Sequence, residues 1–125
     1  MQVLFRAKEK NSNNYVIGYE YYNHVEDEYY ITHYVSGSNY KVDRTTRSIN
    51  IEDMIDSQGN KIFASLSEDG KGGDCTFMEN GYNETFCWDS LNGCIVLKSP
   101  NYEARLFKDK RTTHFKRYKI IGIQE

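Results

Sequence analysis

Residues 48–63, SINIEDMIDSQGNKIF, hold two apolar runs joined by a strong signal for chain reversal. Gly59 can take a positive φ without a Cβ clash, and the side chains of Asp56 and Asn60 can bond to their own backbone. This composition between two apolar runs predicts a hairpin or a tight connection at the centre of the fold. The stretch holds no nucleophile–base pair, metal-ligand cluster or phosphate loop, so its residue chemistry indicates no reaction.

The length and composition indicate one small domain that is rich in strands. A chain of 125 residues can bury a real but limited core. Its 11 tyrosines are typical of strands, as are its many threonines. The formal net charge of −2 gives no global attraction to nucleic acid or to an anionic membrane.

The beginning of the chain and its apolar runs bear on where the protein acts. No apolar run approaches the ~20 residues of a membrane helix. Residues 1–10, MQVLFRAKEK, lack the long apolar region and cleavage site of a signal peptide. We therefore expect a cytoplasmic protein, in whatever cell makes it, with no membrane partner.

The three cysteines, Cys75, Cys87 and Cys94, are odd in number and form no CxxC pair. This spacing argues against a disulfide framework and against a zinc ribbon. We expect buried or half-buried thiols on strands. A metal site shared with one of the three histidines has no support from spacing.

Short runs of β-branched and aromatic residues, separated by Gly, Asn and Asp turns, recur along the chain. They predict strands at residues 3–7, 15–22, 29–35, 40–42, 75–78, 82–88, 94–98, 102–107 and 114–123. The first third indicates an antiparallel meander, although a helix in part of the N-terminal half also fits the short apolar runs. Near-regular strands with turns between them are typical of a small barrel or sandwich.

Several positions carry finer predictions. Gly18, inside a strand pattern, indicates a bulge or a close backbone approach. Residues 67–74, SEDGKGGD, have little to bury and predict a mobile loop. Gly59 and Gly81 are expected in turns with positive φ. The residues expected in the core are Phe5, Ile49, Ile51, Ile62, Phe63, Val96, Leu106 and Ile121.

Three pieces of the sequence together resemble the YopX family of bacteriophage and prophage proteins. Residues 4–8, LFRAK, resemble the opening F-R-A-W/K strand of that family. Residues 118–123 resemble its closing V-I-G strand, with Ile121 and Gly122 in register. Residues 51–63 resemble its central stretch, tGL-x-D-x-x-G-x-x-I-Y/F. The matching positions there are Asp56, Gly59, Lys61, Ile62 and Phe63. The sequence ASLS at 64–67 departs from the E-G-D-I/V that the family commonly has next.

The resemblance implies a mostly β fold, a phage or prophage origin and self-association into a homo-oligomer. It implies no activity, because the family has no established biochemical function. With the strand pattern, it leads us to expect one domain, 1–125, that is mainly β. Within it we expect a strand-rich meander at 1–47, where an α+β arrangement stays open, and a small SH3-like barrel at 48–125.

The first candidate site is a cluster of tyrosines in the first half. Alternation along a strand places Tyr19 and Tyr21 on one face and Tyr22 on the other. Ordinary sheet packing explains about half of such residues, and the rest suit a protein interface. The candidate interface residues are Tyr19, Tyr21, Tyr22, Tyr29, Tyr30 and Tyr34.

The second candidate is a basic C-terminal stretch interleaved with aromatic residues, which could bind phosphates and stack on bases. Its candidate residues are Arg105, Lys108, Lys110, Arg111, Lys116, Arg117 and Tyr118. A solvated edge hairpin whose lysines discourage strand pairing explains the same pattern and is the more common case.

The third candidate is a set of acids in the middle of the chain. They are Glu52, Asp53, Asp56, Glu68, Asp69 and Asp74. Most suit turns for backbone reasons, and their spacing does not match an EF-hand loop. We expect no metal, no cofactor and no catalytic residue, although a metal-dependent hydrolase stays open.

These observations favour a non-enzymatic phage or prophage accessory protein that acts by binding. Its expected partners are itself and a host protein, in host takeover or defence evasion. The alternative is a binder of nucleic acid or of a nucleotide signal through the basic stretch.

Overall fold

The computed structural model describes residues 3–51, 54–77, 83–99, 103–106 and 118–125, with the backbone alone for 103–106. Every regular element in these ranges is a β-strand. The strands are β1 (Val3–Glu9), β2 (Tyr15–Asn23), β3 (Glu28–His33), β4 (Asn39–Ile51), β5 (Ala64–Ser65), β6 (Asp74–Phe77), β7 (Asn83–Asp89), β8 (Cys94–Lys98), β9 (Glu103–Leu106) and β10 (Ile120–Ile123).

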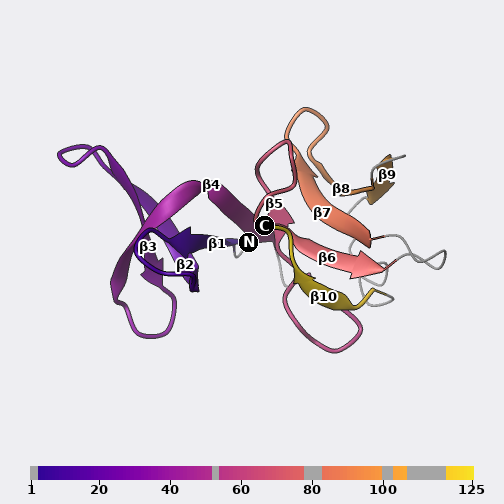
Figure 1. Cartoon of the computed structure of the whole chain (residues 1–125), viewed down its shortest axis with the longest axis horizontal. Helices are drawn as coiled ribbons and strands as arrows, with labels where there is room; N and C mark the ends of the chain where they lie inside the picture. The colour runs from indigo at the N-terminus through magenta and orange to yellow at the C-terminus, as the bar shows by residue number, and fades with distance from the viewer. Residues whose placement is uncertain (1–2, 52–53, 78–82, 100–102, 107–117) are drawn as a thin grey trace.

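The first four strands close into a small antiparallel barrel. Each pairs with the next along the chain, and β1 also pairs with β4. This lobe lies on the left of Figure 1, in indigo to magenta. The predicted mainly β class and a small barrel are therefore confirmed, although the closed barrel lies in residues 3–51, where a meander was expected. Residues 3–51 hold strands in place of the helix that the sequence left open.

One long strand joins the barrel to the rest of the molecule. β4 runs unbroken for 13 residues, although the sequence predicted a short strand at residues 40–42 and, separately, the apolar arm of the central hairpin that holds Ile49 and Ile51. Its first part pairs with β3, whereas Ser48 and Ile49 pair with both β1 and β5. A register shift in β1 between Arg6 and Lys8 accommodates the change. The expected boundary at residues 47 and 48 thus falls inside a continuous strand.

The C-terminal lobe is a sheet centred on β7. β8 pairs with one edge of β7, and β6 pairs with the other edge. β5 adds a short parallel contact at Ser65 and Cys87. β9 extends the sheet beyond β8, and β10 extends it beyond β6 (Figure 1).

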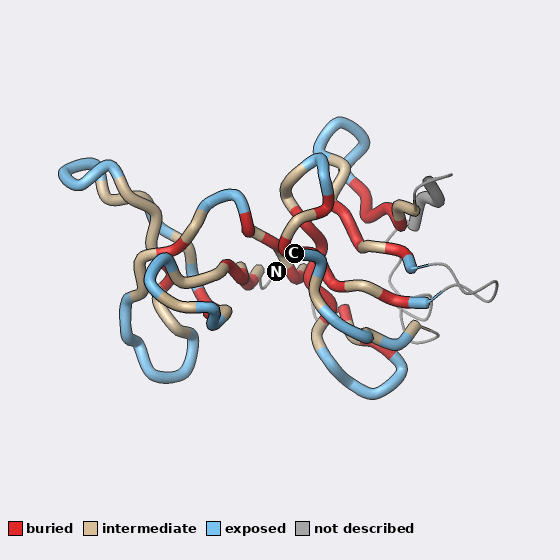
Figure 2. The backbone as a smooth tube through the Cα atoms, viewed as in Figure 1, coloured by how far each residue is buried: buried red, intermediate tan, exposed pale blue. Residues whose placement is uncertain are grey.

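The two lobes have cores of different size. The barrel core consists of Ala7, Val16, Ile31 and Val42. The core of the C-terminal lobe consists of Met54, Ile62, Ala64, Phe86, Ile95 and Leu97. Figure 2 shows buried backbone concentrated in the C-terminal lobe and at its junction with the barrel.

The predicted core is mostly confirmed where the side chains are described. Ile62, Phe63 and Val96 are buried, and Phe5 and Ile49 are partly buried against the two cores. Ile51 is half-buried, and the side chain of Leu106 lies outside the described residues.

The prediction for Ile121 is wrong. Alternation in β10 places Tyr118 and Ile120 against the C-terminal core. Ile121 therefore points to the opposite face, where it is 39% exposed. A register shift between Ile120 and Gly122 interrupts the pairing of β10 with β6 at this position.

The predicted reversal in residues 48–63 is confirmed. The backbone N–H of Asp56 donates to the carbonyl of Asn60 at 2.8 Å, and Gly59 has φ 82°. The strand that returns along β4 is β5, which pairs Ala64 with Ile49. Gly81 lies outside the described residues.

The glycine-rich loop does not match its prediction, because its glycines are buried. Gly72 has φ +83°, and a Cβ there would lie 2.0 Å from the carbonyl oxygen of Thr46. The loop is thus packed directly against β4. Gly18 is packed in the same way, since a Cβ there would lie 1.8 Å from the carbonyl oxygen of Thr32. The predicted close backbone approach at Gly18 is therefore confirmed.

Candidate functional site

A row of stacked side chains crosses the outward face of the barrel. Tyr21 of β2 pairs with Tyr30 of β3, which pairs with Lys41 of β4. The two tyrosine rings stack with centroids 5.3 Å apart and an interplanar angle of 11°. The Lys41 ammonium lies 5.8 Å from the Tyr30 centroid. The row is therefore held by register and ends in a cation.

A second row crosses the other face of the same hairpin, toward the barrel core. Tyr22 and Tyr29 pair across β2 and β3, with centroids 5.0 Å apart. His24 meets the Tyr22 ring edge-on at 4.7 Å. The guanidinium carbon of Arg44, from β4, lies 4.6 Å from the Tyr29 centroid. Both rows thus pair aromatic rings with a cation from β4.

The turn between β2 and β3 is acidic and bonds to both rows. The Tyr30 hydroxyl donates to Glu26, and the Tyr22 hydroxyl donates to Asp27. The bond to Glu26, followed by burial, raises the pKa of Tyr30 to about 12. The bond to Asp27 likewise raises the pKa of Tyr22. These hydroxyls stay protonated and orient the carboxylates beside the rings.

The six candidate tyrosines divide by exposure. Tyr19 and Tyr21 are 49% and 39% exposed on the outward face, whereas Tyr22, Tyr29 and Tyr30 are half-buried. Tyr34 follows β3 and is also exposed. We call the outward side chains of Tyr19, Tyr21 and Tyr30 the tyrosine face.

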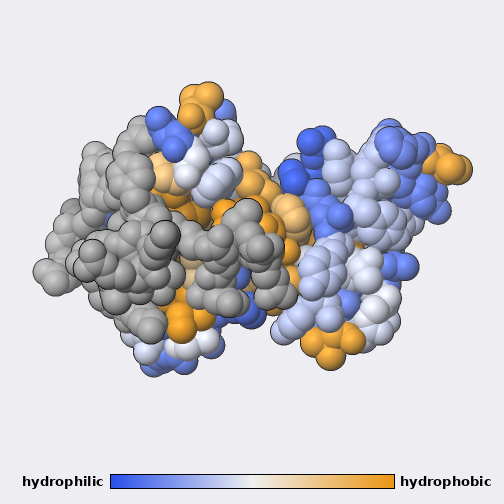
Figure 3. All heavy atoms as spheres, turned by 180° about the vertical axis from the view of Figure 1, so that it is seen from behind, coloured by the Kyte–Doolittle hydropathy of each residue, from blue (hydrophilic) through white to orange (hydrophobic). Residues whose placement is uncertain are grey.

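Figure 3 shows the molecule from behind, with the barrel lobe on the right. The barrel lobe is mostly blue and pale blue, and orange gathers mainly over the C-terminal lobe. Tyrosine lies on the hydrophilic side of the hydropathy scale, so exposed tyrosine rings are not coloured orange, and this view of the barrel shows no large strongly apolar patch.

The basic candidate site lies largely outside the described residues. This holds for Lys108, Lys110, Arg111, Lys116 and Arg117, and for the side chain of Arg105. The described Tyr118 packs edge-on against Phe86, with ring centroids 5.7 Å apart. Its ring contributes to the C-terminal core, while the neighbouring Lys119 is exposed.

The middle acids do not gather into one site in the part of the chain that is described. Glu68 and Asp69 are exposed in a loop, and Glu52 and Asp53 lie outside the described ranges. No group of three or more His, Cys, Asp and Glu residues in the described ranges is placed to hold a metal ion.

Asp56 is buried and organises the central turn. Its carboxylate accepts backbone N–H bonds from Gln58, Asn60 and Ile120 at 2.9, 2.8 and 3.1 Å. Burial acts to raise the pKa of Asp56, but these hydrogen bonds outweigh it and lower the pKa. This acid serves the fold by fixing β10 to the turn.

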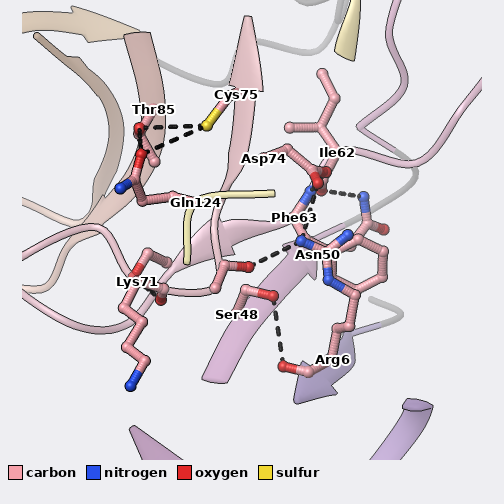
Figure 4. Close-up of polar contacts among 12 residues, drawn as sticks. Arg6, Ser48, Asn50, Ile62, Phe63, Lys71, Asp74, Cys75, Thr85 and Gln124 are labelled. Carbon is pink, nitrogen blue, oxygen red and sulfur yellow. Dashed lines mark hydrogen bonds and ion pairs between the residues drawn. The ribbon is translucent and has the colours of Figure 1, made fainter. Parts of the chain in front are cut away.

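Asp74 forms a buried ion pair that joins the two lobes (Figure 4). A terminal nitrogen of Arg6 lies 2.8 Å from Asp74 Oδ1 and donates to the Gly72 carbonyl at 2.8 Å. The other carboxylate oxygen of Asp74 accepts the Phe63 N–H at 2.8 Å. Burial raises the pKa of Asp74, although the Arg6 guanidinium opposes this. Sequence reasoning missed the pair, because no local pattern links residues so far apart.

Aromatic rings and an amide complete the junction. The Arg6 guanidinium carbon lies 4.7 Å from the Phe63 centroid and 5.5 Å from that of Tyr15. Asn50 Nδ2 donates to the carbonyls of Met54 and Ile62 at 2.9 and 2.8 Å. This cluster is a structural clamp between the barrel and the C-terminal sheet.

The structure describes all three cysteines, and none forms a disulfide. Cys87 and Cys94 are buried, as expected, and Cys75 is half-buried. The Cys75 sulfur lies 3.6 Å from Thr85 Oγ1. Burial raises the pKa of Cys75 and disfavours the reactive thiolate.

Within the described residues, no helix has the length and apolar character needed to cross a membrane. In comparisons with known proteins, no family model, curated protein or solved structure matches the chain.

Proposed function

We propose that this chain is a non-enzymatic accessory protein of a phage or prophage that acts by binding a host protein. The observation that carries the proposal is the tyrosine face. Tyr19 and Tyr21 present large exposed rings beside Tyr30 on a closed barrel. Tyrosine gives a large contact area at low entropic cost, which is why it is enriched at protein interfaces.

The geometry favours recognition through side chains. Each barrel strand has a partner on both sides, so a peptide cannot simply extend this part of the sheet. The stacked pair Tyr21 and Tyr30 is already ordered by cross-strand register. A partner therefore meets a preorganised surface and loses little additional entropy from it.

The buried carboxylates support a role without a catalytic step. The carboxylate oxygens of Asp56 accept hydrogen bonds from backbone N–H groups of the turn and of β10. Asp74 is held by Arg6 and by the Phe63 N–H. Both carboxylates are already engaged in contacts that hold the fold together, which favours a binding function over a hydrolytic one.

Self-association is part of the same proposal. Phe77 and Ile121, on neighbouring strands of the C-terminal sheet, are 60% and 39% exposed. Apolar surface of this kind is readily buried against a second copy of the chain. Light scattering at micromolar concentration should give a mass above the monomer. A monomer mass at both low and high salt would remove this part.

Capture from a bacterial lysate tests the main proposal. The full chain serves as bait beside the double variant Tyr19→Ala/Tyr21→Ala, and Leu91→Ala, at a large side chain that is 95% exposed on the C-terminal lobe, is the control. We expect a protein bound by the wild type and the control and lost by the double variant. Capture of nucleotide or nucleic acid that weakens steeply with salt would instead favour the basic stretch.

A further inference from the structure

We infer that the tyrosine face and its acidic turn form a receptor for positively charged side chains of a partner protein, arginine above all. This rests on the proposed function and names the chemistry of the partner. The observations that carry it are the cations of this chain that already lie over the rings of Tyr30 and Tyr29, and the carboxylates that accept hydrogen bonds from Tyr30 and Tyr22.

Two cations of this chain already lie over tyrosine rings of the β2–β3 hairpin. Lys41 lies over Tyr30, and Arg44 lies over Tyr29 at 4.6 Å. Each hairpin face therefore already accommodates a cation–π contact, whose strength grows when the cation is desolvated. Among the described residues, no cation lies over the ring of Tyr19 or Tyr21, which are the most exposed rings on the β2–β3 hairpin.

The acidic side chains of the hairpin differ in whether a cation of this chain pairs with them. Lys10 pairs with Glu28 at 2.8 Å, and Arg47 pairs with Glu20 at 2.7 Å. In the described part of the chain, Glu26 and Asp27 have no such ion pair and are exposed, and each bonds to a tyrosine hydroxyl. Each of these carboxylates thus lies beside one ring of an aromatic row, where its charge complements a cation resting on a ring.

A ligand of this surface must suit both the tyrosine rings and the carboxylates. A nucleic acid could stack on tyrosine, but the carboxylates of Glu26 and Asp27 repel its phosphates. Arginine can lay its planar guanidinium on a ring and donate to a carboxylate at the same time. The β2–β3 turn projects from the barrel in Figure 1, which leaves it accessible to such a segment.

Fluorescence anisotropy with the full chain tests this inference. The probe is a labelled peptide of alternating arginine and glycine, and the matched peptide carries citrulline, which keeps the shape of arginine without its charge. A labelled single-stranded oligothymidine probes the phosphate alternative. We expect the arginine peptide to bind and both other probes to bind at least ten times more weakly.

Variants locate the contact. We expect Tyr21→Ala to weaken the binding of the arginine peptide about 2- to 30-fold, which is the range of one cation–π contact. Tyr21→Phe should keep most of the affinity, because the ring remains. Glu26→Gln/Asp27→Asn should weaken binding and flatten its salt dependence. Leu91→Ala should leave the affinity unchanged, and circular dichroism verifies that each variant is folded.

Two results would overturn the inference: equal binding of the citrulline peptide, or no effect of Tyr21→Ala and of the Glu26/Asp27 variant. Lysate capture separates this failure from that of the proposed function. A host protein lost with the tyrosine variant but retained with Glu26→Gln/Asp27→Asn would leave the proposed function standing and refute the cationic partner. If both the tyrosine variant and Glu26→Gln/Asp27→Asn still captured the host protein, the result would count against the proposed function and against the cationic partner.

Discussion

The barrel and the C-terminal sheet use aromatic residues in opposite ways. The barrel closes over four small or medium side chains, Ala7, Val16, Ile31 and Val42. A four-stranded ring has little interior volume, so much of the tyrosine of β2 and β3 lies outside it or at its rim. The C-terminal lobe has room for Phe86, and it packs Trp88 and Tyr118 against its core. A sheet that closes with only four strands therefore leaves many of its aromatic strand residues on the surface.

The difference is maintained by the clamp between the lobes. Arg6 reaches from β1 to Asp74 on β6, and Phe63 lies beneath its guanidinium. The clamp fixes the barrel on the larger core while the tyrosine face stays on the barrel's outward side. Changes at the clamp should therefore affect stability, and changes at the tyrosine face should affect binding.

The largest effect is expected from Asp74→Ala, which leaves Arg6 buried without its charge partner. We expect a loss of about 3–5 kcal/mol in the free energy of unfolding. Urea denaturation measures it. The double variant Arg6→Met/Asp74→Leu should recover much of the loss, because it removes both charges. A loss below about 1 kcal/mol for Asp74→Ala would mean that the lobes are stable independently of the clamp.

The next effect is expected at the glycine-rich loop. Gly72→Ala must place a methyl group 2.0 Å from the Thr46 carbonyl while φ stays positive. Gly37→Ala is the matched control, since Gly37 has φ +74° and nothing within 4 Å of an added Cβ. We expect about 1 kcal/mol for the control and about 2–3 kcal/mol or more for Gly72→Ala, by thermal unfolding. Equal losses would mean that the loop moves away from β4 without penalty.

That loop also illustrates what sequence reasoning could reach. Alternating patterns and Gly and Asn turns predicted nearly every strand, because these signals are local. The pattern at Asp56 and Gly59 likewise predicted the central reversal. The same reasoning took the glycines of residues 67–74 as a sign of freedom, although close packing on Thr46 requires them. A glycine that a turn needs and one that a neighbouring strand needs look alike in sequence.

For the candidate site too, the sequence predicted what depends on local alternation and missed what depends on strand pairing. Alternation correctly separated Tyr19 and Tyr21 from Tyr22, since facing follows from strand parity. It could not foresee that Lys41 and Arg44 lie over the tyrosine rings, because this depends on the pairing of β3 with β4. Nor could it foresee that Ile120, and not Ile121, contacts the core.

A smaller effect, with a distinct pH signature, is expected for Asp56→Asn. The folded-state pKa of Asp56 is lowered, so its stabilisation is present above its unfolded pKa and is lost as pH falls through the folded value. The variant keeps a side-chain carbonyl for the turn but loses an acceptor for the Ile120 N–H. We expect a loss of about 1–2 kcal/mol near pH 7 and a smaller loss in acid.

Urea midpoints between pH 2.5 and pH 7 measure this effect. Asp74 acts in the opposite sense, because its raised pKa makes its contribution fall as pH rises through that value. Asp74 is present in both proteins, so the difference between wild type and Asp56→Asn isolates Asp56. Parallel pH profiles would show that the three N–H bonds to Asp56 do not stabilise its charged form.

The smallest effect on stability is expected at the tyrosine face. Its size tests whether the barrel, unlike the C-terminal sheet, keeps aromatic residues outside its core. Tyr21 is 39% exposed and stacks on Tyr30, which is half-buried. A cross-strand aromatic pair contributes roughly 0.2–1 kcal/mol, so Tyr21→Ala should cost less than about 1 kcal/mol. Phe86→Ala, in the C-terminal core, should cost about 3–5 kcal/mol. A double-mutant cycle on Tyr21 and Tyr30, followed by urea denaturation, should give a coupling within the pair range. If Tyr21→Ala cost as much as Phe86→Ala, the barrel would be using its tyrosines as core, and the surface assigned to a partner would be a part of the fold.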